Sequence, residues 1–309
     1  MSGPQCIKNP PTLNSSSGIG NLQEIGGLSS YVTGPVDSNL AILLISDVFG
    51  YEAPLLRKVA DKIATVGYLV IVPDFFYGEP LDRERHDVQT WLKEHGTDKG
   101  CEDAKAVVET LKSKGVSAIG VAGFCWGGMV VSKLAKYGTI GAAVILHPGP
   151  ITIDEINEVR VPTAILAAEH DHIFPADQAK LLGDALSAKS EIESFVKIFP
   201  GVEHGWTVRY NVEDISAVKA AEEAHSDMLN WQGEGKKEEI KVTSEVKIFG
   251  KQREAEVVKA SAQLAKKKAA QSQIATLTEV EAEKEVVIRE AELQMEVDEE
   301  ENGWGNFMG

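Results

Sequence analysis

A cysteine set between glycines is the first residue of this sequence that could do chemistry. Cys125 lies in the stretch GFCWG, residues 123–127, which fits the pattern Gly-x-nucleophile-x-Gly. This pattern is typical of a sharp strand-to-helix turn, in which the nucleophile is strained and the glycines leave room for neighbouring backbone. The N-terminus of the following helix would favour a thiolate. Cys125 is therefore a candidate nucleophile, and the alternative is a small buried residue in a tight turn.

Two later residues could complete a catalytic triad with this cysteine. Asp171 follows an apolar run at residues 163–169, and His204 follows another at 195–200. In α/β-hydrolases the chain order is nucleophile, acid, histidine, and the carboxyl ends of parallel strands build the site. We expect His204 to take the proton from Cys125, and Asp171 to orient the imidazole. Such a triad is suited to cleaving an ester or a lactone through an acyl-enzyme.

The loop after residues 41–47 predicts further parts of such a site. An oxyanion hole would use the backbone N–H of Val48 and that of Trp126, the residue after the nucleophile. Asp47 is a candidate for activating the thiol, and the reading as a turn-capping carboxylate is equally good. His147 also follows an apolar run and is expected to line the substrate pocket rather than to titrate as a second base.

The run EHDH around Asp171 offers a competing interpretation as a metal site. Two histidines, His170 and His172, stand beside Glu169. The sequence shows no second ligand group at metal-like spacing, so the acid of a triad is the stronger interpretation. We therefore expect neither a metal nor a cofactor.

Alternating apolar runs and amphipathic segments predict the fold class. Near-continuous apolar runs are typical of strands buried on both faces of a parallel sheet. The expected class is α/β, with a doubly wound, mostly parallel sheet and a long C-terminal helical extension. The expected strands are 41–47, 68–74, 117–124, 142–148, 163–169 and 195–200, and the expected helices are 53–67, 101–115, 129–138, 175–189 and 212–231.

The composition changes along the chain and predicts three parts. Residues 1–20 are expected to be a disordered N-terminal segment, and residues 21–232 to form the α/β domain. Residues 233–309 are rich in Ala, Glu, Lys and Gln, which favours a long charged helix. Its thin apolar stripe fits either a coiled-coil seam with a partner or a solvated helix.

Charge and cysteine content exclude several classes of protein. The 309 residues carry a net charge of −16, which disfavours nucleic acids and anionic membrane surfaces as partners. No apolar run is long enough to span a bilayer, and the first residues do not fit a secretory signal. Three cysteines are typical of a reducing compartment, so we expect a cytoplasmic protein with a small-molecule substrate.

Five blocks of the sequence resemble the dienelactone hydrolases, cysteine-nucleophile members of the α/β-hydrolase fold. The blocks are SDVFG, YLVIVPDFFYG, GFCWGG, AAEHDHIFP and VEHGW, in family order over about residues 20–232. The resemblance implies that Cys125 is the nucleophile, Asp171 the acid and His204 the base. In bacterial members a glutamate pairs with the resting thiol, and Asp47 takes that position here, one methylene shorter.

The same resemblance nominates residues around the substrate. Bacterial members hold the substrate carboxylate with arginines, which implies a pocket role for Arg209. His147 and Trp206 are further candidates for the substrate pocket. Some plant and fungal relatives carry a label as endo-1,3;1,4-β-glucanases. Glycoside cleavage needs two carboxylates across a sugar cleft, which the triad does not supply, so we expect a glucanase activity least.

The tail resembles a different family. The stretches KVTSEVKIFGKQREAEVVKASAQLAKKKA and VEAEKEVVIREAELQMEV resemble the helical segment of plant flotillins. This resemblance implies either a gene fusion or a faulty gene model, of which we favour the faulty gene model, and it implies a flotillin-type coiled-coil partner. It also defines the alternative function, a catalytically idle scaffold that uses its tail.

Overall fold

The computed structural model describes residues 4–234, together with Lys284 and Arg289. The chain divides into two compact units, Met1–Thr243 and Ser244–Gly309. All helices and strands described below belong to the first unit. The helical and coiled-coil expectations for residues 235–309 fall, apart from the two single residues, outside the described residues.

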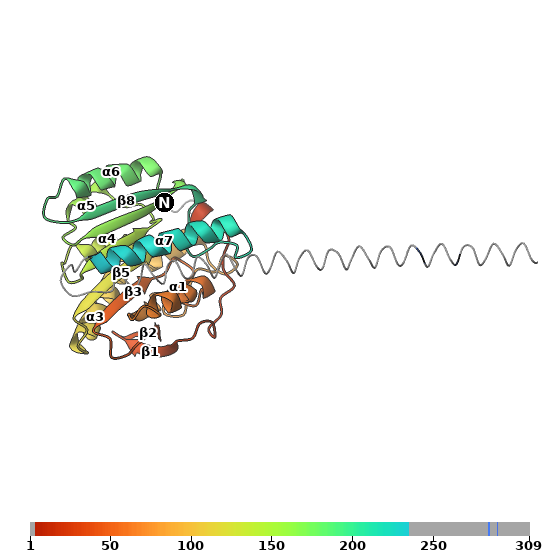
Figure 1. Cartoon of the computed structure of the whole chain (residues 1–309), viewed down its shortest axis with the longest axis horizontal. Coiled ribbons are helices and arrows are strands. Elements are labelled where there is room, and N and C mark those ends of the chain that lie inside the picture. Colours follow the sequence, from red (N-terminus) through yellow and green to blue (C-terminus); the bar gives the residue numbers. More distant parts are fainter. Residues whose placement is uncertain (1–3, 235–283, 285–288, 290–309) are drawn as a thin grey trace, which may run out of the picture. The chain divides into compact units, whose positions relative to one another are not determined.

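An eight-stranded sheet forms the centre of the described part (Figure 1). The six strands from β4 to β8 in the spatial order below are parallel to one another. At the other edge, β2 pairs antiparallel with β4, and β1 pairs antiparallel with β2. This arrangement confirms the mostly parallel sheet expected from the sequence. In spatial order the strands are β1 (Asn21–Ile25), β2 (Leu28–Thr33), β4 (Leu69–Pro73), β3 (Leu40–Ile45), β5 (Ala118–Phe124), β6 (Ala142–Leu146), β7 (Thr163–His170) and β8 (Ser194–Glu203).

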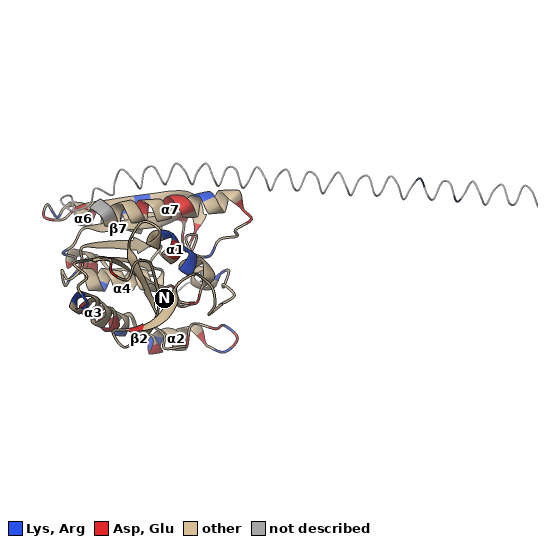
Figure 2. Cartoon of the chain, turned by 60° about the horizontal axis from the view of Figure 1, so that its bottom comes forward, with Lys and Arg blue, Asp and Glu red and all other residues tan. Residues whose placement is uncertain are grey.

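Helices cover both faces of this sheet, as a doubly wound fold requires. One face packs against α1 (Pro54–Ala64) and α7 (Ile215–Glu234), and a hydrophobic cluster fills the space between them and the strands. A second cluster lies on the other face, beneath α3 (Thr97–Ser113), α4 (Trp126–Ala135) and α6 (Ala176–Ser187), with the short α2 (Val88–Glu94) and α5 (Ile153–Asn157). Charged residues lie mostly on the helices and loops, and the central strands β3, β4, β5 and β6 carry none (Figure 2).

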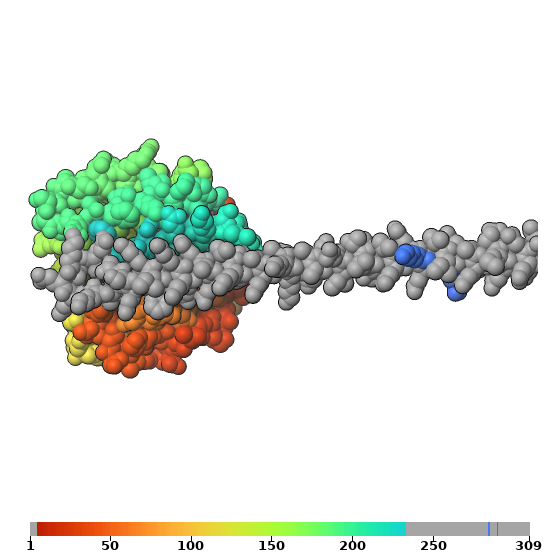
Figure 3. Space-filling view, viewed as in Figure 1, coloured from red at the N-terminus to blue at the C-terminus, as the bar shows by residue number. Residues whose placement is uncertain are grey.

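The helix α1 shows how the sequence directs one of these layers. Its buried Leu56, Val59, Ala60 and Ile63 recur at the spacing of one helical face, and they pack into the cluster on that side of the sheet. Pro54 occupies the first helical position, where its missing N–H costs nothing. The sheet order then places the orange early segments, from β1 to α1, on one side of the described part and the green α6 and β8 region on the opposite side (Figure 3).

Several parts of the chain differ from the expectation. The short helices α2 and α5 were not predicted. The antiparallel pair β1 and β2 was not predicted either; it turns at Gly26 and Gly27, both of which have a positive φ. The expectation of a disordered start is wrong for residues 4–20. A short 3-10 helix forms at Pro4–Ile7, and Cys6 within it is buried.

None of the described helices combines the length and the apolar character that crossing a membrane requires.

Candidate active site

The turn at Cys125 joins β5 to α4, as the glycine pattern predicts. The cysteine has φ 53° and ψ −108°, a conformation that residues with a side chain rarely adopt. A Cβ at Gly123 would lie 2.2 Å from the carbonyl oxygen of Gly127, and a Cβ at Gly127 would lie 2.2 Å from that of Ile45. The turn therefore needs glycine on both sides, because the backbone passes too close for any side chain.

His204 and Asp171 form a buried pair at the carboxyl edge of the sheet. Asp171 follows the end of β7, and His204 follows the end of β8. The imidazole Nδ1 lies 2.7 Å from Asp171 Oδ2, and both side chains are fully buried. The other carboxylate oxygen accepts the backbone N–H of Ile173, at 2.8 Å, and of Phe174, at 3.1 Å. Asp171 is thus fixed in place and can orient the imidazole.

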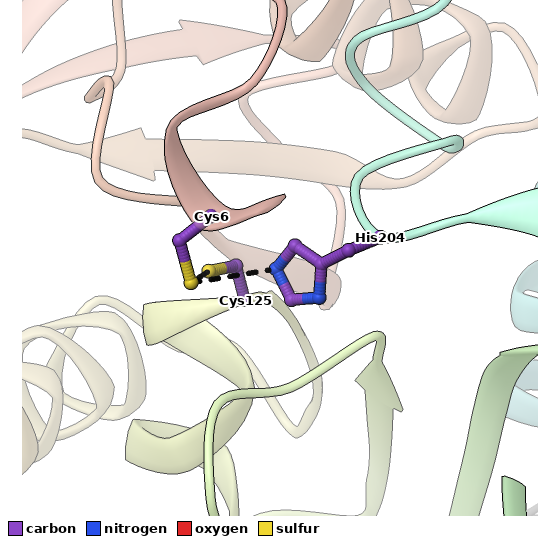
Figure 4. A group of neighbouring side chains, drawn as sticks. All are labelled: Cys6, Cys125 and His204. Atoms are coloured by element: carbon purple, nitrogen blue, oxygen red, sulfur yellow. Dashed lines mark hydrogen bonds between the residues drawn. The ribbon is translucent and has the colours of Figure 1, made fainter. Parts of the chain in front are cut away.

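A second cysteine, which the sequence did not single out, lies against the first. Cys6 Sγ is 3.4 Å from Cys125 Sγ and 3.8 Å from His204 Nε2, with all three side chains buried (Figure 4). The sulfur and nitrogen atoms of the three residues all lie within 4.8 Å of one another. Cys6 comes 119 residues before Cys125, and no local pattern marks it.

The surroundings raise the pKa of both Cys125 and His204. The hydrogen bond with Cys6, and then burial, raise the pKa of the Cys125 thiol, while His204 opposes this shift. Burial by itself lowers the pKa of His204, but Cys125 and Asp171 more than offset it and raise that pKa to about 9. In its neutral form the imidazole is thus a strong base, while the contact with Cys6 disfavours a resting thiolate.

The two backbone donors expected for an oxyanion hole have no partner among the described hydrogen bonds. Within residues 4–234, no hydrogen bond uses the N–H of Val48 or that of Trp126. Trp126 is the first residue of α4, where an N–H has no partner within the helix. Its indole donates to the carbonyl of His95 at 2.8 Å, which anchors the side chain away from the sulfur. Both expected oxyanion donors are therefore unoccupied.

Asp47 does not contact the thiol, as its candidate role would require. Its Oδ1 accepts the backbone N–H of Phe49 at 3.0 Å, and its Oδ2 lies 3.1 Å from Arg209 Nε. Burial raises the pKa of Asp47, and the neighbouring guanidinium opposes that shift. No hydrogen bond described for the chain joins Asp47 to Cys125. One oxygen of the Asp47 carboxylate thus caps a turn, and the other forms an ion pair with Arg209.

Arg209, which was expected to line the substrate pocket, bonds the N-terminal backbone as well as lying beside Asp47. Its Nη1 donates to the carbonyl oxygens of Cys6, at 2.9 Å, and of Lys8, at 2.6 Å. The guanidinium therefore links Asp47 to the N-terminal segment, by which we mean residues 4–8. In this arrangement Nη1 is hydrogen-bonded and Nε lies beside Asp47, while Nη2 is buried without a hydrogen-bond partner.

Further contacts attach the N-terminal segment to the loops around the site. The Gln5 amide donates to the carbonyl of His170 at 2.9 Å and accepts the backbone N–H of His172 at 2.7 Å. Lys8 forms an ion pair with Glu203, the last residue of β8. The segment lies across the sulfur, and Cys125 is only 1% exposed.

Of the two other pocket candidates, His147 packs against the imidazole of His204, and Trp206 packs against His147. The ring of His147 is 5.1 Å from those of His204 and of Trp206, measured between centroids. His147 Nε2 lies 2.7 Å from Thr207 Oγ1. Burial lowers the pKa of His147, so it stays neutral beside His204. The ring of His147 therefore contacts both His204 and Trp206.

The EHDH run does not gather as a metal site. Glu169 and His170 are exposed, and Glu169 accepts the backbone N–H of Gly201 at 2.7 Å. Asp171 is turned inward, to His204. Across the described residues, the group of donors that is close enough to hold an ion is instead Cys6, Cys125 and His204.

The chain is similar to known proteins over the domain that carries this site. The model of the Dienelactone hydrolase family matches residues 28–235. A protein named endo-1,3;1,4-beta-D-glucanase from Zea mays is 38% identical over 194 residues, which span 61% of this chain and 63% of that protein. A carboxymethylenebutenolidase homolog from Xenopus tropicalis is 34% identical over 67% of this chain and 87% of its own length.

The solved structures agree on the fold. A putative dienelactone hydrolase from Klebsiella pneumoniae superposes with a TM-score of 0.60 at 20% identity, covering 70% of this chain and 98% of its own. The predicted ester- or lactone-cleaving enzyme class is thereby confirmed at the level of the family. The flotillin resemblance of the tail has no counterpart among these matches. From residue 28 to residue 235, the chain belongs to the dienelactone hydrolase family.

Proposed function

We propose that the protein hydrolyses a small carboxylic ester or lactone through a thioester on Cys125. One observation carries the proposal: a cysteine held in a strained turn lies beside a histidine that is hydrogen-bonded to a buried aspartate. Nucleophile, base and orienting acid are the three parts that covalent acyl transfer requires.

The residues divide the reaction into two halves. His204 Nε2 takes the Cys125 proton as the sulfur attacks the carbonyl carbon, and the N–H groups of Val48 and Trp126 bind the resulting oxyanion. Collapse of this intermediate breaks the ester C–O bond, and the imidazolium protonates the departing alkoxide. Water, deprotonated by His204, then attacks the thioester and releases the acid and the thiol. With a lactone, alcohol and acid stay in one ring-opened molecule.

Access to the sulfur requires the N-terminal segment to move. A reacting carbonyl carbon must come within about 3–3.5 Å of its nucleophile. Cys6 Sγ lies at this distance from Cys125 Sγ, 3.4 Å, and so takes a place that the substrate carbonyl needs. Moving Cys6 away also removes the first cause of the raised Cys125 pKa. Substrate entry and activation of the thiol therefore accompany the same displacement.

The carboxylates of the site support ester rather than glycoside cleavage. A glycosidase needs one carboxyl group as acid and another, about 5–10 Å away, as base or nucleophile. Here Asp171 is bound to His204, and Asp47 is paired with Arg209. Neither is free to face a sugar. We therefore do not extend the name of the maize relative to this chain, and we favour the lactone and ester chemistry implied by the name of the frog relative.

A panel of aryl esters and small lactones tests the proposal. Wild type, Cys125→Ala and His204→Gln are compared with Cys101→Ser, a matched change at a buried cysteine on α3. We expect hydrolysis by wild type and by Cys101→Ser, and a loss of at least about 100-fold in the other two. Mass spectrometry should find an acyl adduct on the tryptic peptide 115–133, which contains Cys125. Full activity in Cys125→Ala would exclude the mechanism.

A further inference from the structure

Three metal-binding atoms meet in the core of the site, although their residues are far apart in the sequence. Cys6 comes from the 3-10 helix, Cys125 from the turn before α4, and His204 from the loop after β8. Their two sulfurs and one imidazole nitrogen lie within 4.8 Å of one another, and all three residues are buried. Hydrolysis as proposed above uses Cys125 and His204 and assigns no chemical step to Cys6.

Two of the three distances between the donor atoms fit a tetrahedral zinc ion, and the third, between Cys125 and His204, lies within 4.8 Å. Zinc binds thiolate sulfur at about 2.3 Å and imidazole nitrogen at about 2.0–2.1 Å, so tetrahedral angles put two sulfurs about 3.8 Å apart and a sulfur about 3.5 Å from the nitrogen. In the structure Cys6 Sγ is 3.4 Å from Cys125 Sγ and 3.8 Å from His204 Nε2. Shifts of about 0.4 Å or less would bring both distances to those values. Figure 4 shows the side chains converging in this way.

The imidazole is already oriented as a ligand. Metal-binding histidines usually donate their other ring N–H to a carboxylate, which fixes the tautomer and makes the ligating nitrogen more basic. The Nδ1 of His204 lies 2.7 Å from Asp171 Oδ2, and backbone N–H groups of Ile173 and Phe174 hold that carboxylate. Nε2 consequently faces the two sulfurs.

The second thiol is also held in position. Arg209 bonds the carbonyl of Cys6, and the Gln5 side chain bonds the backbone of His170 and of His172. Cys6 is thus presented by an anchored backbone rather than by a free chain end. Ordering it for an ion costs little additional conformational entropy.

We propose that Cys6, Cys125 and His204 bind one thiophilic divalent cation, specifically Zn²⁺, which reversibly blocks the active site. Two soft sulfur ligands and one imidazole select zinc over magnesium or calcium, which prefer oxygen. Binding replaces two S–H bonds by two Zn–S bonds, and the Nε2–H bond of a protonated His204 by a Zn–N bond, so it releases two or three protons with no change of oxidation state. The fourth tetrahedral position is left for water. The bound ion occupies the lone pairs of nucleophile and base, so hydrolysis stops until the ion is removed.

Metal binding to the full-length protein tests this site directly. The protein is stripped of metal, kept reduced with a phosphine, and mixed with zinc or with Co²⁺ as a coloured probe. We expect one zinc per chain after gel filtration, and a cobalt spectrum with thiolate charge transfer and tetrahedral absorption. Cys6→Ser should bind zinc at least about 100-fold more weakly, since losing even a carboxylate behind a ligand costs 10–100-fold. Asp171→Asn should show that smaller loss.

Controls separate this site from nonspecific binding and from misfolding. Cys101→Ser should bind zinc as wild type does, and the circular dichroism and melting temperature of Cys6→Ser establish that it is folded. Three results would each overturn the proposal: no stoichiometric zinc, equal zinc binding by folded Cys6→Ser, or an octahedral cobalt spectrum without thiolate bands. Loss of binding in His172→Ala, with retention in Cys6→Ser, would place the ion in the EHDH loop and would also overturn it.

Activity assays then test the blocking effect, which rests on the proposed function. Zinc should inhibit ester hydrolysis by wild type, a chelator should restore it, and Cys6→Ser should need at least about 100-fold more zinc for the same inhibition. If no ester is cleaved but the cobalt spectrum appears, the metal site stands and the proposed function fails. If esters are cleaved and zinc neither binds nor inhibits, the metal site fails and the hydrolase stands.

Discussion

Replacing Arg209 by methionine tests how the buried ion pair holds the site together. Methionine keeps most of the length of the arginine side chain but carries no charge, so the Asp47 carboxylate stays buried without its cation. Removing one partner of a buried pair costs about 3–5 kcal/mol, because the remaining charge is left unpaired. The three bonds to the N-terminal carbonyls of Gln5, Cys6 and Lys8 add less than their separate values, since a detached segment regains water. We therefore expect about 3–5 kcal/mol of destabilisation at neutral pH.

The effect should depend on pH with a definite sign. Burial raises the pKa of Asp47 and Arg209 opposes that shift, so in Arg209→Met the pKa rises further. A carboxyl group with a raised folded-state pKa contributes stability that is present below its unfolded pKa, about 3.9, and is lost as pH rises through the folded value. Arg209→Met should therefore be weakest at neutral and alkaline pH, and should recover toward wild type as the pH falls to about 4.

Urea unfolding followed by tryptophan fluorescence measures these differences. Arg85→Met, at an exposed ion pair with Asp82, is the matched control and should change stability by less than about 0.5 kcal/mol. The double variant Asp47→Asn, Arg209→Met removes the unpaired charge and should be more stable than Arg209→Met alone. A loss below about 1 kcal/mol, or a double variant no better than the single one, would refute the reasoning.

Three shorter predictions concern the catalytic residues and the turn. Asp171→Asn should lower kcat/KM by about 10²–10⁴-fold, measured with the best ester of the panel, because the imidazole loses its orienting charge; an unchanged rate would count against the triad. Since the pKa of His204 is raised from 6.5 to about 9, its contribution to stability is complete below about pH 6.5 and is lost toward pH 9. The free energy of unfolding should fall by up to about 3 kcal/mol over that range, and His204→Gln should flatten the slope. Gly127→Ala should cost about 3 kcal/mol or more in urea unfolding, because its Cβ would meet the Ile45 carbonyl at 2.2 Å, whereas Gly141→Ala, whose nearest contact is an ordinary 3.6 Å, should be tolerated.

The sequence was sufficient to find the residues that follow parallel strands. Asp171 and His204 each come directly after a buried strand, and all such strand ends meet at one edge of the sheet. Their chain order after Cys125 then predicted the triad. The glycines of the turn were also readable, since their steric reason is local.

Residues whose roles depend on distant contacts could not be found in this way. Cys6 is held at the site by distant residues, among them Arg209, which lies more than 200 residues later and bonds its carbonyl. The same arginine takes up the Asp47 carboxylate, so the role expected for Asp47 at the thiol was not supported. The β1–β2 pair is a different case: a Gly-Gly turn between short segments was visible in the sequence, but β1 is mostly exposed and gives no apolar run.

The contacts of the N-terminal segment also bear on the order of folding. Gln5 is separated by 165 residues from His170, and Cys6 by 203 from Arg209, so their docking surface exists only after β7, β8 and the following loop are in place. We expect docking to be among the last folding events and release to be among the easiest local openings, because residues 4–8 can detach without disturbing the sheet. Amide hydrogen exchange in the segment should then be faster than in β5, and the nucleophile should become reachable through an opening far smaller than global unfolding.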